Sequence, residues 1–299
     1  MFGLSIAYRK LEVALDRVTA RIAEHISGEK QYQECARRAL PILVRQAEAG
    51  NSIFYSDLAK ELGMPNPRNL NYVLGSIGRT IENLRKEWKE KVPPIQCLVI
   101  NKREHLPGEG IGWFLIKEEE FRKLPPARKR ALVDAELAKV YGYPRWRKVL
   151  QTLNLSLPPQ SYEELNKAAA KLGGGESQSH RMMKEFVSRH PSVVGLPYST
   201  GEGELEKPLP SGDRLDVSFS TKAGWVAVEV KSEISDEVDI TRGLYQCVKY
   251  IAVMQAVEAS EKREINARAL LAIAGELPEK LIPLRNTLGI TVVENVPSK

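Results

Sequence analysis

The sequence contains few cysteines, and they lie far apart. Cys35, Cys97 and Cys247 are the only three in 299 residues, and none belongs to a Cys-x-x-Cys pair. Structural zinc sites and disulfide frameworks both depend on closely spaced or evenly paired cysteines. The pattern argues against both, and it fits a reducing cytoplasm, where we expect this protein to act.

Long apolar runs and nucleotide-motor motifs are missing as well. No apolar stretch reaches the roughly 18 residues that a membrane-spanning helix needs. Charged residues come too early in the first segment, MFGLSIAYRK, for a secretory signal. The motif Gly-x-x-x-x-Gly-Lys-Ser/Thr, which would bind nucleotide phosphates, does not occur. We therefore expect no membrane attachment and no internal ATPase motor.

The net charge of +6 is unevenly distributed along the chain. Residues 1–160 hold 27 Lys/Arg and 18 Asp/Glu, whereas residues 161–299 hold the remaining 17 basic and 20 acidic residues. A basic half joined to a slightly acidic half suits a nucleic-acid binder coupled to a carboxylate-based catalytic site. A soluble protein that is merely basic is the alternative interpretation of the same charge.

Apolar periodicity and turn-forming residues predict two domains. Helices are expected in the first half over residues 8–27, 31–49, 55–63, 69–89 and 118–153, the last broken at Pro144, with a strand over 97–100. Linker-like segments at 156–160 and 173–175 place the boundary between them, giving domains 1–160 and 161–299. The second half then alternates helix (176–189), strands (213–220 and 224–231), helix (239–259), strand (268–274), helix (277–287) and strand (290–294). This mixed order predicts an α/β protein of the α+β kind.

The residues best suited to chemistry lie on two of these strands. Asp216 is on the first strand, and Glu229 and Lys231 are on the second. Because side chains alternate along a strand, Glu229 and Lys231 share one face and the intervening valines take the other. The short connection through residues 222–224 predicts a hairpin that brings Asp216 beside Glu229. The alternative is a half-buried strand pair whose polar ends simply face solvent.

Two neighbouring carboxylates repel each other unless a positive charge lies between them. A divalent cation with oxygen ligands satisfies both, so Asp216 and Glu229 are candidate ligands for Mg²⁺, with Mn²⁺ expected to substitute. Such an ion can activate water and stabilise charge on a phosphate. Lys231 is placed to orient or deprotonate that water, or to neutralise the charge that develops on phosphorus.

Asp216, twelve intervening residues and then Glu229-Val230-Lys231 resemble the motif of the PD-(D/E)xK nuclease superfamily, which has the restriction-endonuclease-like fold. One departure is visible, because Leu215 stands where the motif has proline. The resemblance implies metal-dependent hydrolysis of phosphodiester bonds by Asp216, Glu229 and Lys231.

The next helix strengthens this resemblance. Gln246 and Tyr250 are four residues apart and therefore share a helix face. They are similar to the QxxxY element that follows the ExK motif in RecB-like members of the superfamily, where both residues support the site and the DNA backbone. Arg242 lies one turn earlier on the same face, where it contacts either phosphate or solvent.

The superfamily often supplies a further acidic residue from the first helix of its core. Here the resemblance favours Glu176 as a third catalytic and metal-binding carboxylate, with Glu185 as second choice. The alternative for Glu176 is a glutamate favoured by the helix dipole. His180 lies one turn after Glu176 and is either a packed or surface histidine or a catalytic one. The buried stripe of this helix is expected at Met182, Met183, Phe186 and Val187.

The first half has a second resemblance. Segments 55–63, 92–100 and 107–110, with a helix between the first two, are similar to the winged-helix DNA-binding domain of alkylguanine-DNA alkyltransferases and alkyltransferase-like proteins. Gln96 stands in place of the nucleophilic cysteine, and Cys97 is offset by one position, so we expect a core cysteine and no alkyl transfer. The resemblance implies DNA docking by the helix after residue 68, with candidate contacts at Arg68, Asn69, Asn71 and Arg79. A small helical packing domain is the alternative.

These patterns together predict a Mg²⁺-dependent DNA endonuclease of restriction or antiphage-defence type with an N-terminal DNA-recognition domain. Cutting both strands of a duplex needs two active sites, so a homodimer is expected, and a partner protein of a defence or repair system fits the same prediction. The alternatives are a structure-specific repair or recombination nuclease, and a catalytically silent DNA-binding scaffold.

Overall fold

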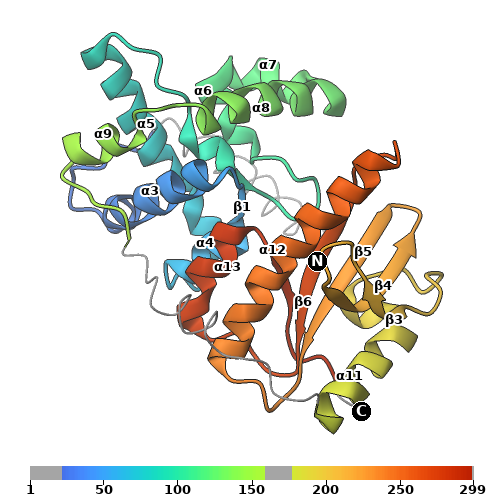
Figure 1. Ribbon diagram of the computed structural model, residues 1–299. Helices are drawn as coiled ribbons and strands as arrows, with labels where there is room; N and C mark the ends of the chain where they lie inside the picture. Colours follow the sequence, from blue (N-terminus) through green and yellow to red (C-terminus); the bar gives the residue numbers. More distant parts are fainter. Residues whose placement is uncertain (1–21, 159–176, 298–299) are drawn as a thin grey trace, which may run out of the picture. The chain divides into compact units, whose positions relative to one another are not determined.

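The computed structural model describes residues 22–158 and 177–297. Its contacts divide the chain into two compact units, residues 1–159 and 160–299. The first unit is mainly helical, and the second is built on a five-stranded mixed sheet (Figure 1). This combination confirms the α+β class expected from the sequence. None of the described helices is long and apolar enough to cross a membrane.

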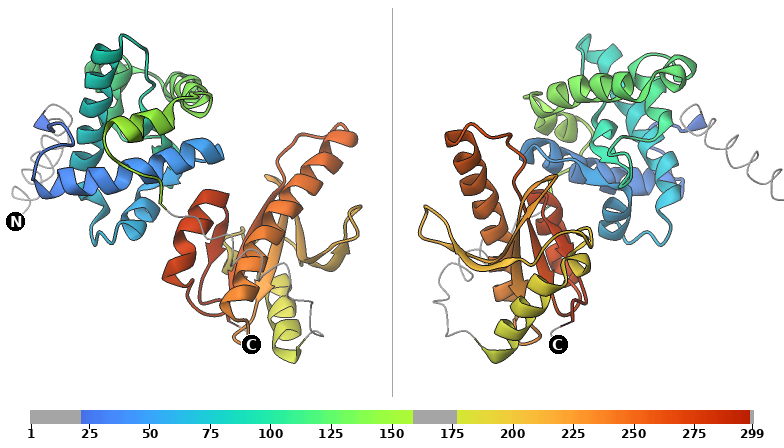
Figure 2. Two further views of the ribbon diagram at one scale, coloured as in Figure 1. Left: turned by 60° about the vertical axis from the view of Figure 1, so that its left-hand side comes forward. Right: turned by 90° about the vertical axis from the view of Figure 1, so that its right-hand side faces the viewer.

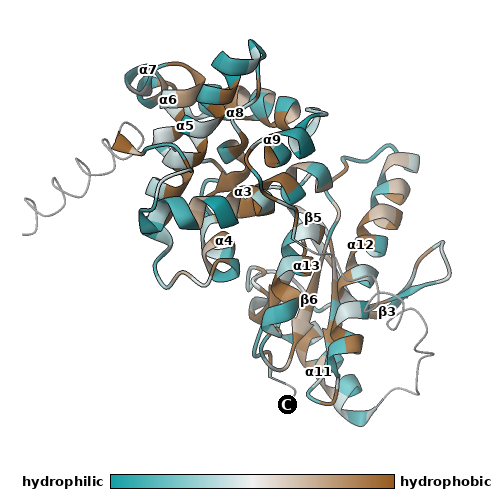
Figure 3. Cartoon of the chain, turned by 90° about the vertical axis from the view of Figure 1, so that its left-hand side faces the viewer, coloured by the Kyte–Doolittle hydropathy of each residue, from teal (hydrophilic) through white to brown (hydrophobic). Residues whose placement is uncertain are grey.

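Two crossing helices, α3 (Gln31–Ala49) and α5 (Leu70–Trp88), form the centre of the first unit (Figure 2). Each has buried apolar residues at spacings of three and four, so each presents one apolar face to the common core. Hydrophobic and hydrophilic residues accordingly alternate around the helices (Figure 3). α3 ends where Gly50 takes a left-handed conformation with φ of 71°, which glycine adopts without a steric penalty.

Shorter elements complete the first unit. A two-residue strand, β1 (Ile53–Phe54), pairs in parallel with β2 (Val99–Ile100). The remaining helices are α4 (Tyr55–Glu61), α6 (Gly112–Leu115), α7 (Glu118–Lys123), α8 (Pro126–Tyr141) and α9 (Trp146–Thr152).

Three expectations for the first unit need correction. The strand expected over 97–100 begins only at Val99, because Ile95–Leu98 form a 3-10 helix after two prolines. The helix expected over 118–153 is three helices, since Pro125 and Pro126 break it before Pro144 does. Residues 23–27 are not helical, and carbonyls of Ile26 and Gly28 accept hydrogen bonds from Arg37 instead. Residues 8–21 and 173–175 lie outside the described residues.

The sheet of the second unit has the order β3-β4-β5-β6-β7. β3 to β5 are antiparallel neighbours, and β5 to β7 are parallel neighbours. The strands are β3 (Glu204–Pro208), β4 (Arg214–Thr221), β5 (Gly224–Lys231), β6 (Arg268–Ile273) and β7 (Thr291–Val293). β4 and β5 confirm the expected hairpin. β3 was not expected, because it is a largely exposed edge strand of charged residues without apolar alternation.

Helices cover both faces of this sheet. α11 (Gln178–Arg189) packs against β3, β4 and β5 on one face, and α12 (Glu237–Ser260) packs against β5 and β6 on the other (Figures 1 and 2). Val226, Val228 and Val230 lie in the core under α11, whereas Ala227 lies in the core under α12. The alternation expected along this strand is therefore confirmed, and it places Glu229 and Lys231 on the α12 face.

The ends of α12 and α11 follow from their sequences. Asp236 accepts a hydrogen bond from the backbone N–H of Asp239 and forms a capping box with it, as expected for aspartate at a helix start. The stripe expected on α11 is correct for Met183 and Val187, which are buried. Met182 is 39% exposed, and the stripe instead continues through Lys184 and Ser188. A short helix, α13 (Ile282–Leu288), connects β6 to β7.

Candidate active site

Asp216 lies where β4 and β5 separate. The paired register of the two strands ends at Val217 and Val228. Just beyond it, Oδ2 of Asp216 accepts a hydrogen bond of 2.8 Å from the backbone N–H of Val230. The Asp216 carboxylate thus accepts the hydrogen bond that a backbone carbonyl of β4 would accept if the strands stayed paired. This bond holds Asp216 directly against Glu229-Val230-Lys231.

The other oxygen of Asp216 faces α11. Oδ1 lies 3.6 Å from Nε2 of His180 and 3.9 Å from Nζ of Lys184. Burial acts to raise the pKa of Asp216, but His180, the Val230 amide and Lys231 outweigh it and hold that pKa below its usual range. Asp216 is therefore an anion at neutral pH.

Glu229 is held in a different environment, on the α12 side. Its side chain is almost completely buried, with Oε1 accepting from Nζ of Lys231 at 2.6 Å and Oε2 accepting from the Tyr250 hydroxyl at 3.0 Å. Burial, and then the negative charge of Asp216, raise the pKa of Glu229 to about 7 although Lys231 and Tyr250 oppose the shift. The charge of each carboxylate thus affects the other, and the pKa of Glu229 lies above that of Asp216.

Gln246 and Tyr250 join the same network from α12. Oε1 of Gln246 lies 3.4 Å from Nζ of Lys231, and its Nε2 lies 3.4 Å from the Tyr250 hydroxyl. The Tyr250 hydroxyl also lies 3.1 Å from the carbonyl oxygen of Arg214, a second acceptor for its single proton. The Gln-x-x-x-Tyr spacing therefore places both side chains on the face that meets Glu229 and Lys231.

Gly243 allows α12 to approach the sheet this closely. A Cβ atom at this position would lie 2.8 Å from Cδ1 of Leu271 and 3.0 Å from Cε of Lys231. Those separations are shorter than packed carbon atoms adopt, so a larger side chain would push α12 away from β5. The signal for this close approach in the sequence is a glycine inside a helix, three residues before Gln246.

Lys184 and Glu206 are two further residues that the sequence did not indicate. Lys184 is only 4% exposed, and its ammonium pairs with Oε1 of Glu206 on β3 as well as approaching Asp216. From the sequence, a buried lysine in an amphipathic helix cannot be distinguished from a lysine that faces solvent. Its pairing with Glu206 depends on β3, a strand that was itself unexpected.

The remaining candidates of this unit lie at different distances from the network. Glu176, expected as a third carboxylate, lies outside the described residues. Glu185 is half-exposed and lies 3.5 Å from Arg189 on its own helix, so it is not among the groups that contact Asp216. Arg242 is on α12, one turn before Gln246, as expected.

The donor atoms at this site suit a small divalent cation in type. Carboxylate oxygens are the ligands that Mg²⁺ prefers. Burial and the charge of Asp216 raise the pKa of Glu229, and a cation bound between the two carboxylates would favour its ionised form. Within residues 22–158 and 177–297, no group of three His, Cys, Asp or Glu side chains is close enough to hold a metal ion. Asp216 and Glu229 remain the candidate carboxylate ligands among the described residues.

In the first unit, the DNA-contact candidates lie around the start of α5. Arg68 and Asn69 belong to an exposed 3-10 turn, Pro67–Asn69, which leads into the helix, and Asn71 follows in its first turn. Arg79 lies further along and pairs with Glu82 at 2.9 Å. Three of the four candidates thus gather at the start of the helix. The positive charge of Arg79 is partly neutralised by Glu82.

Cys97 and Gln96 differ in their surroundings. Cys97 is fully buried, and burial raises the pKa of its thiol far above the usual range, so the expectation of a core cysteine is confirmed. Gln96 is also buried, and among the described residues neither polar atom of its side chain has a hydrogen-bond partner. Gly78 of α5 leaves space for this amide, since a Cβ there would lie 2.6 Å from Nε2 of Gln96.

Comparisons with protein-family models, with curated proteins and with solved structures found no match to this chain.

Proposed function

We propose that this protein is a Mg²⁺-dependent DNA endonuclease of restriction or antiphage-defence type. The observation that carries the proposal is the connected set of Asp216, Glu229, Lys231 and Tyr250. Val230 N–H binds Asp216, Lys231 and Tyr250 bind Glu229, and Gln246 lies beside the lysine. This arrangement combines two linked carboxylates with a buried ammonium group, a composition that suits metal-dependent hydrolysis of a phosphodiester.

Asp216 and Glu229 would hold the ion, and Glu176 is the proposed additional ligand. When bound, Mg²⁺ lowers the pKa of a water molecule and stabilises negative charge on the phosphate. The low pKa of Asp216 keeps one ligand ionised over the whole neutral range. Tyr250 fixes the second carboxylate by donating to its Oε2.

Lys231 has the role of orienting the attacking water or neutralising the charge that develops on phosphorus. Its ammonium has three N–H donors, and Glu229 accepts from one at 2.6 Å. Oε1 of Gln246 lies 3.4 Å from the same Nζ atom and accepts from a second N–H. The third donor direction remains for a water molecule or a phosphate oxygen.

The first unit would supply DNA recognition through the start of α5. Arg68 is suited to a phosphate or to a guanine edge, and Asn69 and Asn71 are suited to base edges. Cleavage of both strands would involve two copies of the chain. The proposal also includes a partner protein that belongs to a defence or repair system.

The test is incubation of the full-length protein with supercoiled plasmid and with phage DNA, in Mg²⁺, in Mn²⁺ and in EDTA. We expect nicked or linear product in either metal and none in EDTA. Asp216→Ala should give no product while still binding DNA. Cleavage of branched DNA alone would favour a structure-specific repair nuclease. Tight DNA binding without cleavage of any substrate would favour a silent scaffold.

A further inference from the structure

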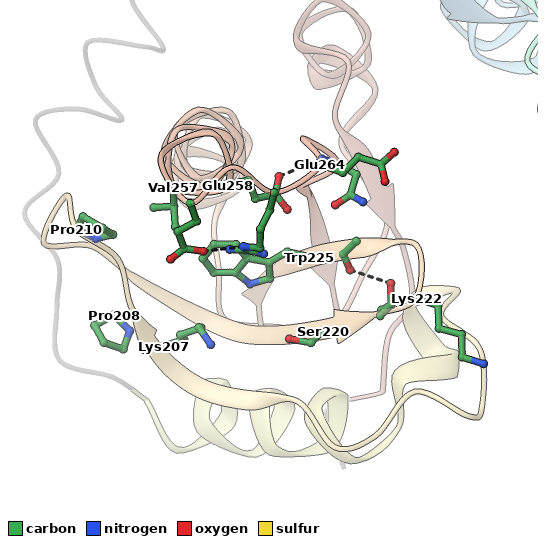
Figure 4. A pocket seen from close by; sticks show the side chains of 14 residues that line it. Lys207, Pro208, Pro210, Ser220, Lys222, Trp225, Val257, Glu258 and Glu264 are labelled. Atoms are coloured by element: carbon green, nitrogen blue, oxygen red, sulfur yellow. Dashed lines mark hydrogen bonds and ion pairs between the residues drawn. The ribbon is translucent and has the colours of Figure 1, made fainter.

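A pocket of about 520 Å³ lies on the α12 face of the sheet, beyond the active-site network. That size is within the range of small-molecule sites. Its walls come from β3, from the turn between β4 and β5, from the C-terminal end of α12 and from the loop that leads to β6 (Figure 4). The proposed function does not use any of these lining residues.

Trp225 provides the aromatic surface of the pocket. The indole is half-buried, and its Nε1 donates a hydrogen bond of 2.8 Å to Oγ of Ser218, which fixes the ring. The ammonium of Lys207 lies 5.6 Å from the ring centroid. In Figure 4 the indole lies between Lys207 and Glu258. A fixed indole next to an open volume is a stacking platform for a flat ring.

Glu258 provides the polar group. It is only 1% exposed, and its Oε2 accepts backbone hydrogen bonds from Asn266 at 3.0 Å and Ala267 at 2.9 Å. Oε1 accepts no hydrogen bond within the described part of the chain. A nearly buried carboxylate oxygen that lines a pocket calls for an N–H or O–H donor from whatever occupies the pocket.

The charges of the lining favour a neutral occupant. Three basic residues, Lys207, Lys222 and Arg263, balance the carboxylates of Glu258, Glu261 and Glu264. Arg263 pairs with Glu261 at 2.6 Å, and Lys207 pairs with Glu204 at 2.6 Å. The pocket thus combines a flat aromatic wall, a buried carboxylate that can accept a hydrogen bond and little net charge.

We propose that this pocket binds a nucleobase that carries an exocyclic amino group, with its ring on Trp225 and its amino N–H donated to Oε1 of Glu258. Adenine, cytosine and guanine have such a group, whereas thymine, uracil and hypoxanthine do not. Stacking on Trp225 contributes affinity for any base. Glu258 contributes selectivity, because thymine, uracil and hypoxanthine have a carbonyl oxygen at the ring position where cytosine and adenine carry the amino group. A base held in the same orientation would then set one acceptor against another.

The pocket is separate from the active-site network. Trp225 and Glu229 are on β5, four residues apart and on the same face, which corresponds to about 13 Å along the strand. Ala227 lies between them and is buried under α12, so a nucleic-acid strand cannot run along this face from Lys231 to the pocket. The inference therefore does not rest on the proposed function.

The experiment measures binding in EDTA, so that cleavage plays no part. End-labelled oligo(dA) and oligo(dT) are titrated with full-length protein and followed by fluorescence anisotropy, and adenosine and inosine monophosphates serve as free ligands. We expect oligo(dA) to bind more tightly than oligo(dT). Trp225→Ala should weaken oligo(dA) binding by roughly 5- to 100-fold, the range for loss of one base stack. Trp225→Phe should retain most of the affinity.

Glu258→Gln provides the second readout, with thermal unfolding confirming that the variant folds. It should reduce the preference for adenine over thymine, and for adenosine over inosine, while leaving oligo(dT) binding almost unchanged. Competition by adenosine monophosphate would identify a free nucleotide as the source of the base, and binding of oligonucleotides alone would identify a strand. Equal affinity for oligo(dA) and oligo(dT), or unchanged oligo(dA) binding by Trp225→Ala, would overturn the proposal. Asp216→Ala separates the two ideas, because it should lose cleavage and keep the adenine preference.

Discussion

The hydroxyl of Tyr250 donates a hydrogen bond of 3.0 Å to Oε2 of Glu229, and this bond ties α12 to β5. Both residues are at most 2% exposed, so water cannot replace the bond if it is lost. The partner oxygen, Oε1, is held by Lys231. Tyr250 therefore determines which way the carboxylate of Glu229 points.

Replacing Tyr250 by phenylalanine should impair cleavage more than folding. The change leaves Oε2 of Glu229 buried without its donor, a loss of about 1–3 kcal/mol, which corresponds to a fall in cleavage rate of roughly 5- to 100-fold if it is felt in the transition state. Single-turnover cleavage of plasmid DNA measures it. Tyr198→Phe is the matched control, since Tyr198 is 91% exposed. Equal rates for the two variants would show that Tyr250 has no part in the site.

The raised pKa of Glu229 predicts a pH-dependent stability in the absence of metal. The ordinary value is 4.5 and the folded value is about 7, so the folded state binds the proton more tightly than the unfolded state does. Stability conferred by this group is then lost as the pH rises from about 4.5 to about 7, by an amount on the order of 3 kcal/mol. Asp216, whose pKa is lowered, changes stability only at more acidic pH.

Urea unfolding in EDTA at pH 5 and at pH 7.5 measures this effect. The groups that face Glu229 are Asp216 on β4, Lys231 on β5 and Tyr250 on α12. Lys231 stays charged throughout, because Glu229 raises its pKa despite the opposing effect of burial. Glu229→Gln should remove most of the loss between the two pH values. A wild-type protein that gains stability over this range would contradict the assignment, and added Mg²⁺ should diminish the loss by favouring the ionised form.

Lys184 should contribute to the stability of the second unit as well as to the position of Asp216. Lys184→Met removes an ammonium group that bridges Glu206 and Asp216. We expect a loss of about 1–3 kcal/mol in the free energy of unfolding, below the range for a fully buried pair because Glu206 is half-exposed and regains water. Glu206→Gln, which keeps the lysine, should lose less. Equal stability of Lys184→Met and wild type in urea would show that the contact is not significant.

The sequence predicted the central part of this site because alternation along a strand is a strong local signal. The opposite placement of Val228 and Glu229 on β5, and the shared face of Gln246 and Tyr250 on α12, follow directly from the periods of the two elements. Lys184 and Glu206 could not be predicted in this way. Their contact joins a buried lysine to an exposed edge strand, and neither residue belongs to an apolar pattern.

The pocket at Trp225 and the close approach at Gly243 were hidden for a related reason. Each depends on how tightly α12 packs against β5, and packing distance is a tertiary property. The separations of 2.8 Å and 3.0 Å from a virtual Cβ at Gly243 become visible only once helix and sheet are placed together. Expectations for the first unit were less accurate next to its prolines. A 3-10 helix follows Pro94 where a strand was expected, and α8 begins at Pro126 where a continuous helix was expected.

The central claim is that Lys231, held by Glu229 at 2.6 Å, acts in phosphodiester hydrolysis. The most direct test is the single-turnover cleavage rate of Lys231→Ala in Mg²⁺, beside Lys280→Ala, an exposed lysine that pairs with Glu237. We expect Lys231→Ala to lose cleavage while still folding and binding DNA, with a lower free energy of unfolding because the buried carboxylate of Glu229 loses its ammonium partner. Lys280→Ala should cut at the wild-type rate. Cleavage by Lys231→Ala at the wild-type rate would contradict the account.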